Sequence, residues 1–181
     1  MPRSQRGALT RERILEATAR AFDRSGYLGL NLKEVVEDLG LTKGALYYFF
    51  PTKESLAAEI VRRHVSAFEP IVSAALAEKS DMIDALIEIG QQMARRYETD
   101  SFTRAGTRLL SERALISTEL PEPFVDWIER VTGLLRTGQQ QGQVRADVDP
   151  EETAQMVVSF LHGAQTLSDQ FSDRQDLSVR L

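Results

Sequence analysis

The segment from Asn31 to Lys53, NLKEVVEDLGLTKGALYYFFPTK, predicts two short helices joined by a tight turn. Asn31 is a favourable N-cap, and Glu34 lies three residues later, where it can bond back to the cap nitrogen. The first helix should begin at residue 32 and stop at Gly40, because glycine readily adopts the left-handed conformation after a helix. Thr42 then caps a second helix. This spacing is typical of a helix-turn-helix, whose second helix enters the DNA major groove.

The second helix carries side chains that suit a nucleic-acid surface. We expect the ammonium of Lys43 and the phenols of Tyr47 and Tyr48 to reach phosphates or base edges, and Gly44 to let the backbone approach closely. Base readout should come from the first turns of the 42–49 helix. The complete set of expected DNA-binding residues is Asn31, Lys33, Thr42, Lys43, Gly44, Tyr47, Tyr48 and Lys53.

A helix should precede this pair and support it as the first member of a three-helix head. Thr10 is its expected N-cap, Ile14 and Phe22 lie on its inner stripe, and Gly26 should end it. Upstream of Thr10, we expect Arg3 and Arg6 to lie either in a loose arm that touches the DNA minor groove or backbone, or in a solvated tail.

The charge of the chain is unevenly distributed. The net charge is −5, which is unusual for a DNA-binding protein. However, residues 1–53 carry nine Lys and Arg against six Asp and Glu, whereas the remainder carries 13 against 21. Because phosphate binding depends on the local field, a basic head on an acidic body is compatible with DNA recognition.

Helical patterns continue to the end of the chain, and no strand pattern occurs. A long helix should run from Lys53 towards Phe68, with Pro70 kinking or stopping it. We expect further helices from Ser80 or Asp81, over 102–111, from Phe124 to the Gly/Gln-rich segment 138–142, and from Asp149 to Phe171. The predicted fold class is therefore all-α. We expect a DNA-binding domain over 1–52 and a ligand-binding and dimerisation domain over 53–181.

The segment from Thr42 to Leu56, TKGALYYFFPTKESL, resembles the N-terminal signature of the TetR family of bacterial transcription regulators. The resemblance extends upstream through Ile14, Ala17, Phe22 and Gly26-Tyr27, and it covers roughly residues 8–60. It implies a homodimer that binds a pseudo-palindromic operator and responds to a small molecule.

A narrower resemblance lies in the second half. The segments FTRAGTRL (102–109) and LPEPFVDW (120–127) are similar to the γ-butyrolactone autoregulator receptors of Streptomyces. The resemblance implies that Trp127, the only tryptophan, lines a pocket for a lactone or a related butenolide. His64 stands where that family often has glutamine, so the polar contact differs. The expected ligand-binding residues are His64, Leu86, Met93, Leu109, Trp127, Val131, Val158 and His162.

Dimerisation is expected because palindromic half-sites need a protein with two-fold symmetry. The 150–171 helix is the best candidate interface, and the resemblance implies that the last helix completes a four-helix bundle with it. Since residues 176–181 look like the opening turn of such a helix, we expect the given chain to stop within it. A ligand entering between the 53–69 helix and the helices over 82–97, 124–137 and 151–171 would tilt the 53–69 helix and change the spacing of the two heads.

Other functions remain open at this point. A repressor that senses another apolar compound, such as an antibiotic, and a ligand-free co-regulator both fit the sequence. An enzyme does not: there are two histidines, no cysteine, no glycine-rich phosphate loop and no metal-ligand spacing, so no cofactor or metal is expected. No apolar run approaches the ~18 residues of a membrane span, and we expect a cytoplasmic protein without membrane contacts.

Overall fold

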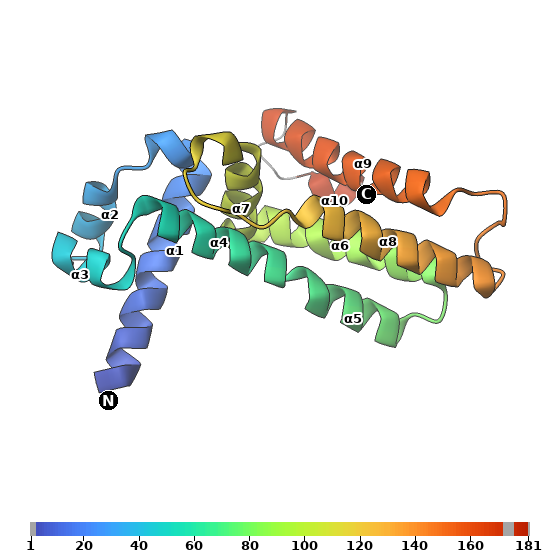
Figure 1. Cartoon of the computed structure of the whole chain (residues 1–181), viewed down its shortest axis with the longest axis horizontal. Coiled ribbons are helices and arrows are strands. Elements are labelled where there is room, and N and C mark those ends of the chain that lie inside the picture. The colour runs from blue at the N-terminus through green and yellow to red at the C-terminus, as the bar shows by residue number, and fades with distance from the viewer. Residues whose placement is uncertain (1–2, 172–175, 181) are drawn as a thin grey trace. The chain divides into compact units, whose positions relative to one another are not determined.

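The chain is described by a computed structural model over residues 3–171 and 176–180. Every regular element within these two ranges is a helix, so the all-α prediction is confirmed. The chain divides into two compact units. Unit 1 comprises residues 1–65 and 100–121, and unit 2 comprises residues 66–99 and 122–181. The helices are labelled in Figure 1. The expected functional boundary between residues 52 and 53 stays a prediction.

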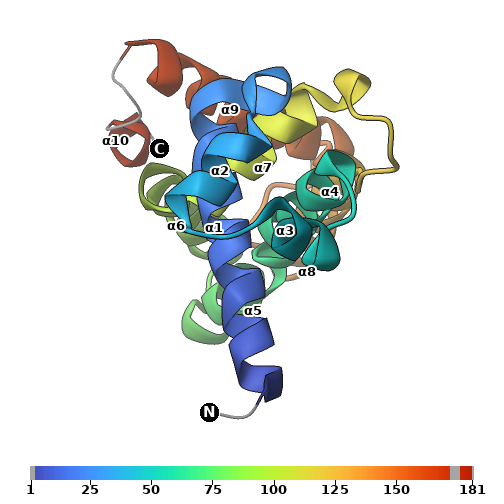
Figure 2. The same cartoon turned by 90° about the vertical axis from the view of Figure 1, so that its left-hand side faces the viewer.

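Unit 1 contains the expected three-helix head together with three later elements. Its core includes Ile14 and Phe22 from the predicted inner stripe of the first helix, together with Leu46, and all three are fully buried. Figure 2 shows α1 extending past α2 and α3 towards its N-terminal end. The elements are α1 (Arg3–Gly29), α2 (Leu32–Asp38), α3 (Lys43–Phe49), α4 (Lys53–Ser66) up to Val65, α7 (Ser101–Ser111) and the 3-10 helix η1 (Arg113–Leu115).

Helix α1 differs from the prediction at its N-terminal end. It begins at Arg3, so the expected loose arm around Arg3 and Arg6 was wrong. Thr10 is not a cap, because its hydroxyl donates to the carbonyl oxygen of Arg6 at 2.9 Å from inside the helix. Residues 3–9 contain no proline, so nothing stops the helix from extending through them. At the other end Gly26 interrupts the helix with φ of 68°, as expected, and one further turn follows.

The helix-turn-helix forms as predicted, with one change at its first cap. The side chain of Asn31 accepts from the backbone N–H of Lys33 at 3.0 Å. Glu34 accepts from the Asn31 side-chain amide at 2.8 Å instead of from the cap backbone nitrogen. Gly40 has φ of 64°, and the hydroxyl of Thr42 accepts from the N–H of Ala45 at 3.2 Å. These local bonds fix where α2 ends and α3 begins.

The long helix predicted from Lys53 ends where the proline requires it. Helix α4 stops at Ser66 and α5 (Phe68–Glu78) begins two residues later. Pro70 lies in the first turn of α5 and has no N–H to donate to the carbonyl of Ser66. The continuous helix is therefore divided into two.

Unit 2 is built from the remaining helices, of which α6 and α9 start at the predicted caps. Asp81 accepts from the N–H of Ile83 at 2.8 Å, and Asp149 accepts from the N–H of Glu152 at 2.9 Å. None of the described helices is both long enough and apolar enough to cross a membrane. In addition to α5, the elements are α6 (Met82–Thr99), α8 (Pro123–Gln140), α9 (Pro150–Phe171) and α10 (Leu177–Arg180).

Candidate functional site

Helix α3 has one buried side and one exposed side. Leu46 is fully buried and anchors the helix in unit 1. Tyr47 and Tyr48 are exposed by 46% and 82%, so both phenols are available. Thr42, Lys43 and Gly44 are also exposed. The predicted DNA-contacting residues of α3 therefore share an accessible surface at and beyond its N-terminal turn.

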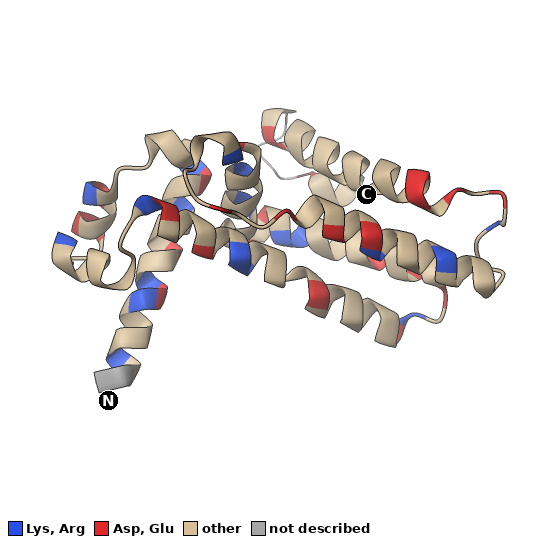
Figure 3. Ribbon diagram, viewed as in Figure 1, with Lys and Arg blue, Asp and Glu red and all other residues tan. Residues whose placement is uncertain are grey.

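Lys43 is the only charged residue of α3, and the rest of that helix is tan in Figure 3. Its ammonium makes no hydrogen bond or ion pair with any side chain described in residues 5–171 and 176–179. Tyr48 has an edge-on contact with Phe49, with ring centroids 5.1 Å apart. An unpaired ammonium beside two free phenols is suited to phosphate oxygens and base edges.

The two expected residues of the α2 region have different local roles. Asn31 is engaged as the helix cap. The ammonium of Lys33 lies 3.6 Å from the Glu37 carboxylate, and both side chains are largely exposed. Such a surface pair is weak, so Lys33 can exchange Glu37 for a phosphate.

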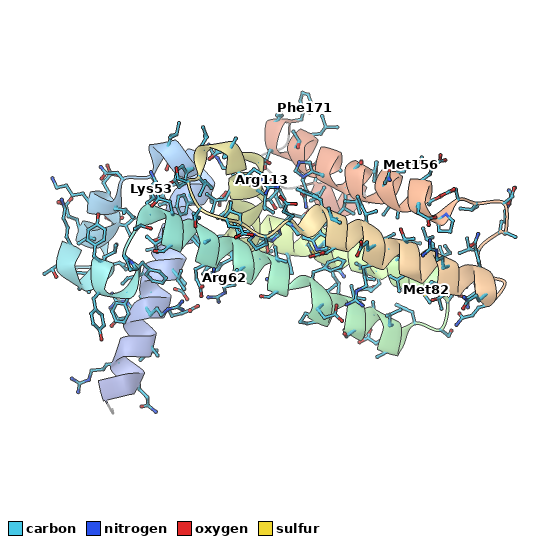
Figure 4. All side chains as sticks on the ribbon, in the orientation of Figure 1. Lys53, Arg62, Met82, Arg113, Met156 and Phe171 are labelled. Atoms are coloured by element: carbon cyan, nitrogen blue, oxygen red, sulfur yellow. The ribbon has the colours of Figure 1, made fainter. Side chains whose placement is uncertain are left out.

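Lys53 is placed differently from the sequence expectation of a free phosphate contact. Its ammonium donates to the backbone carbonyl oxygen of Leu30 at 3.1 Å and lies 4.8 Å from the centroid of the Tyr27 ring. Burial lowers the pKa of Lys53, and the neighbouring Glu54 carboxylate opposes that shift. Figure 4 labels Lys53 at the start of α4. In this arrangement the ammonium joins α4 to the chain just before α2.

The eight expected ligand-binding residues are divided between the two units. His64 of α4 and Leu109 of α7 belong to unit 1, and both are buried. A Cβ on Gly106 of α7 would lie 2.4 Å from the Cβ of His64, so glycine is what allows the histidine to pack there. The remaining six residues lie in unit 2: Leu86, Met93, Trp127, Val131, Val158 and His162.

The six residues of unit 2 lie on three helices. Met93 of α6 belongs to one buried apolar cluster, and Val131 of α8 belongs to another. Leu86 packs against both clusters, and Val158 of α9 packs against the second. The pocket role of these residues stays a prediction, since buried apolar side chains also serve as ordinary core.

Two of the expected ligand-binding residues, Trp127 and His162, belong to one aromatic cluster. Its other members are Phe68 and Phe124. The Trp127 ring centroid lies 5.6 Å from that of Phe68 and 5.4 Å from that of Phe124. Phe124 in turn contacts His162, with centroids 5.3 Å apart. Sequence reasoning did not assign Phe68 or Phe124 to the site. The spacing of Phe124 and Trp127 on one helical face was the only available signal.

Helix α9 also carries an exposed apolar strip. Met156, Phe160, Leu167 and Phe171 are exposed by 71%, 59%, 45% and 74%, and their spacing of four, seven and four residues places them on one face. Gly163 lies at the centre of this face, and a Cβ there would meet nothing within 4 Å. No charged residue occurs from 153 to 168, as the uniformly tan middle of α9 in Figure 3 shows. Figure 4 labels Met156 and Phe171 towards the two ends of this helix.

Two family models match the chain. "Bacterial regulatory proteins, tetR family" matches residues 14–60, which include the helix-turn-helix. "Tetracyclin repressor-like, C-terminal domain" matches residues 80–180. Together they cover both the head and most of the helices that follow it.

Individual relatives agree with these models. The A-factor receptor protein of Streptomyces griseus is 33% identical over 177 residues, which are 98% of this chain and 61% of that protein. The chain thus spans about three fifths of this relative's length. The structure of a gamma-butyrolactone receptor (ArpA-like protein) has a TM-score of 0.80 at 30% identity and covers 97% of each chain.

A second similar structure was solved with DNA. CprB of Streptomyces coelicolor, in complex with its biological operator sequence, has a TM-score of 0.80 at 33% identity, covering 90% of this chain and 79% of that one. These relatives are regulators and receptors, not enzymes, in agreement with the absence of catalytic motifs from the sequence. The helix-turn-helix, the helical body and both matched models lead to one conclusion: the chain belongs to the TetR family of bacterial regulatory proteins.

Proposed function

We propose that the chain is a transcriptional repressor that binds operator DNA and is released by a small hydrophobic signal of the γ-butyrolactone type. The observation that carries the DNA-binding part is the exposed face of α3, where Lys43 and the phenols of Tyr47 and Tyr48 have no hydrogen-bond or ion-pair partner among the described side chains. Thr42 and Lys33 would add phosphate contacts beside it. The first turns of α3 would read base edges in the major groove.

A homodimer would present two such helices to a pseudo-palindromic operator. The α9 strip (Met156, Phe160, Gly163, Leu167 and Phe171) is the surface that supports this part of the proposal. It is apolar over about four turns, uncharged in its middle, and has a glycine where a second helix would approach most closely.

The effector class is supported by the A-factor and gamma-butyrolactone receptors among the relatives and by the apolar interior of unit 2. The aromatic cluster around Trp127 offers flat apolar surface for a lactone ring or its alkyl chain. A ligand that binds the DNA-free conformation better shifts the balance between two states by its differential affinity alone. Coupling of ~1–3 kcal/mol, or about 5–150-fold in operator affinity, is typical of such systems.

The proposal is tested by fluorescence polarisation on labelled DNA from upstream of the chain's own gene. Synthetic γ-butyrolactones of graded alkyl-chain length are added to the complex, and the ring-opened hydroxy acids of the same length are the matched controls. We expect specific binding that the lactones release and the hydroxy acids do not.

Other results of this experiment would favour one of the alternative functions. Binding that no lactone releases, but that an apolar antibiotic does, would retain the repressor and replace the ligand. Binding that no small molecule changes would favour a ligand-free co-regulator. Failure to bind this DNA or any duplex from a random pool would overturn the repressor function itself.

A further inference from the structure

Three charged side chains about one turn apart contact the C-terminal end of α1. They are Arg104 and Arg108 of α7 and Glu112, the C-cap of that helix, and we call them the α7 charged cluster. Arg104 Nε donates to the Asp23 carboxylate at 2.8 Å, and the two side chains are only 17% and 10% exposed. Arg108 Nη1 donates to the backbone carbonyl oxygens of Asp23 and Arg24 at 2.9 and 3.1 Å. These carbonyls belong to the last turn before the break in α1, where helical partners run out.

Glu112 completes the contact at the interruption of α1. Its carboxylate accepts from Arg108 Nε at 3.0 Å and from the backbone N–H of Tyr27 at 2.5 Å. Gly26, between these groups, has φ of 68°, and a Cβ there would lie 2.5 Å from Glu112 Oε1. The cluster therefore supplies acceptor and donor groups to both sides of the break, and it requires the glycine.

The contacts continue from Tyr27 to the start of the helix-turn-helix. The Tyr27 hydroxyl donates to the Glu54 carboxylate at 2.7 Å. Lys53 lies over the Tyr27 ring and donates to the carbonyl oxygen of Leu30, one residue before the α2 cap. All of these residues belong to unit 1, so a continuous series of contacts joins α7 to the first turn of α4 and to Leu30, just before the α2 cap.

Chain connectivity links α7 to unit 2. Thr99, the last residue of α6, belongs to unit 2, and Asp100 alone separates it from α7. Asp100 is the N-cap of α7 and accepts from the N–H of Phe102 at 3.0 Å and from the hydroxyl of Thr103 at 2.8 Å. Because a single capped residue connects the two helices, we expect movement at the end of α6 to displace α7.

We propose that the α7 charged cluster is a set of positioning residues that sets the orientation of the helix-turn-helix according to the state of unit 2. This inference rests on the repressor function proposed above. A buried ion pair contributes little stability beyond that of apolar packing, but it fixes direction and can change partners when helices shift. This proposal explains the RAGTR segment over 104–108. Its two arginines bond to the end of α1, and Gly106 between them allows His64 of α4 to pack closely.

The first test is hydrogen exchange by mass spectrometry on the full chain. Arg104→Met and Arg108→Met remove the donors and keep comparable length. Arg136→Met is the control, because it also removes one positive charge but breaks the exposed Arg136–Glu151 pair of unit 2. We expect exchange over residues 30–50 to accelerate about fivefold or more in the α7 variants and not in the control. Acceleration confined to 20–29 and 100–112 would show a local cap and overturn the proposal.

The second test is operator affinity, using a duplex that the wild-type protein selects from a random pool. We expect about fivefold or greater weakening for Arg108→Met, with an unchanged slope of log affinity against log salt, since the residue positions and does not touch DNA. Wild-type affinity, or a slope reduced by about one, would overturn the positioning role. If the wild-type protein selects no duplex, the repressor function fails, and this proposal fails with it.

A double-mutant cycle separates coupling from simple loss of charge. Asp23→Asn and Arg104→Met each leave one partner of a largely buried pair uncompensated. We expect the double variant to lose less operator affinity than the two single losses combined. Additive losses would show that the Asp23–Arg104 pair has no specific part in positioning.

Discussion

The ammonium of Lys53 donates to the backbone carbonyl oxygen of Leu30 at 3.1 Å, which joins the first turn of α4 to the residue before the α2 cap. Lys43, only ten residues earlier, has no comparable partner among the described residues and lies at the exposed start of α3. Two lysines that look equivalent in the sequence thus differ in structure. One is available for phosphate, and the other is already engaged.

This difference predicts that substitution of Lys43 affects DNA binding and substitution of Lys53 affects stability. Lys43→Ala should weaken operator binding and lower the salt slope by about one, because one phosphate contact is lost. Lys53→Met should leave the slope unchanged and lower the free energy of unfolding by about 1–2 kcal/mol, because a charge-assisted hydrogen bond is lost. Binding is measured by polarisation between low and moderate salt, and unfolding by urea titration. If Lys53→Met reduces the salt slope, Lys53 contacts a phosphate, as the sequence suggested.

Trp127 separates effector response from DNA binding. Replacing Trp127 with Ala removes the ring that contacts Phe68 and Phe124 in unit 2. We expect the response to γ-butyrolactone to fall at least about tenfold, while operator affinity without ligand changes little, because a pocket residue acts through ligand binding. Trp127→Phe, which retains an aromatic ring, should keep part of the response. If operator binding is lost instead, Trp127 is a core residue and not a ligand contact.

A comparison of Gly26 with Gly40 tests how closely α1 packs against Glu112 at the end of α7. Both have positive φ, of 68° and 64°, but only at Gly26 would a Cβ meet a neighbour, Glu112 Oε1 at 2.5 Å. Gly40→Ala should therefore cost about 1–2 kcal/mol of unfolding free energy from the backbone alone. Gly26→Ala should cost more than Gly40→Ala, because it also displaces Glu112. Equal losses in urea titrations would mean that Glu112 moves aside freely.

The Tyr27 phenol predicts a stability change at alkaline pH. Burial and the hydrogen bond to Glu54 raise the pKa of Tyr27 from 10.0 to about 12. A raised pKa means that the folded state favours the protonated phenol, so its stabilising contribution is complete below pH 10 and is lost as the pH rises through about 12. The difference in unfolding free energy between wild type and Tyr27→Phe should be constant up to about pH 10 and shrink above it.

Tyr48→Phe, at an exposed position, is the control for that titration. It removes a phenol hydroxyl that makes no hydrogen bond to any of the described side chains. A constant difference for Tyr27→Phe across the whole range would show that the phenol contributes nothing through its protonation.

The α9 strip predicts the assembly state. Phe160→Asp introduces a charge into the centre of the exposed apolar face and should convert a dimer into monomers, because the carboxylate would be desolvated in the interface. Val125→Asp, at a 55% exposed position of α8, is the matched control and should leave the mass unchanged. Sedimentation velocity gives both masses. A dimeric Phe160→Asp variant would place the interface elsewhere.

Local sequence signals were sufficient to predict the helices of this protein and the ends of most of them. Caps such as Asn31, Thr42 and Asp149 act on neighbours two or three residues away, and Pro70 breaks a helix through its own missing N–H. Such effects are local, so they can be identified without knowledge of the fold. The start of α1 was mistaken because the hydroxyl of Thr10 can cap a helix or bond back within one, and the local pattern fits both.

The partners of these residues, in contrast, depend on how the helices pack. Lys53 meets Leu30 across 23 residues, and Glu112 meets the N–H of Tyr27 across 85. Neither pair has a periodicity that a sequence pattern could reveal. The same reason explains why α7, which follows α6 directly in the chain, belongs to the compact unit of the helix-turn-helix. Long-range contacts depend on how helices pack, and packing is a property of the whole chain.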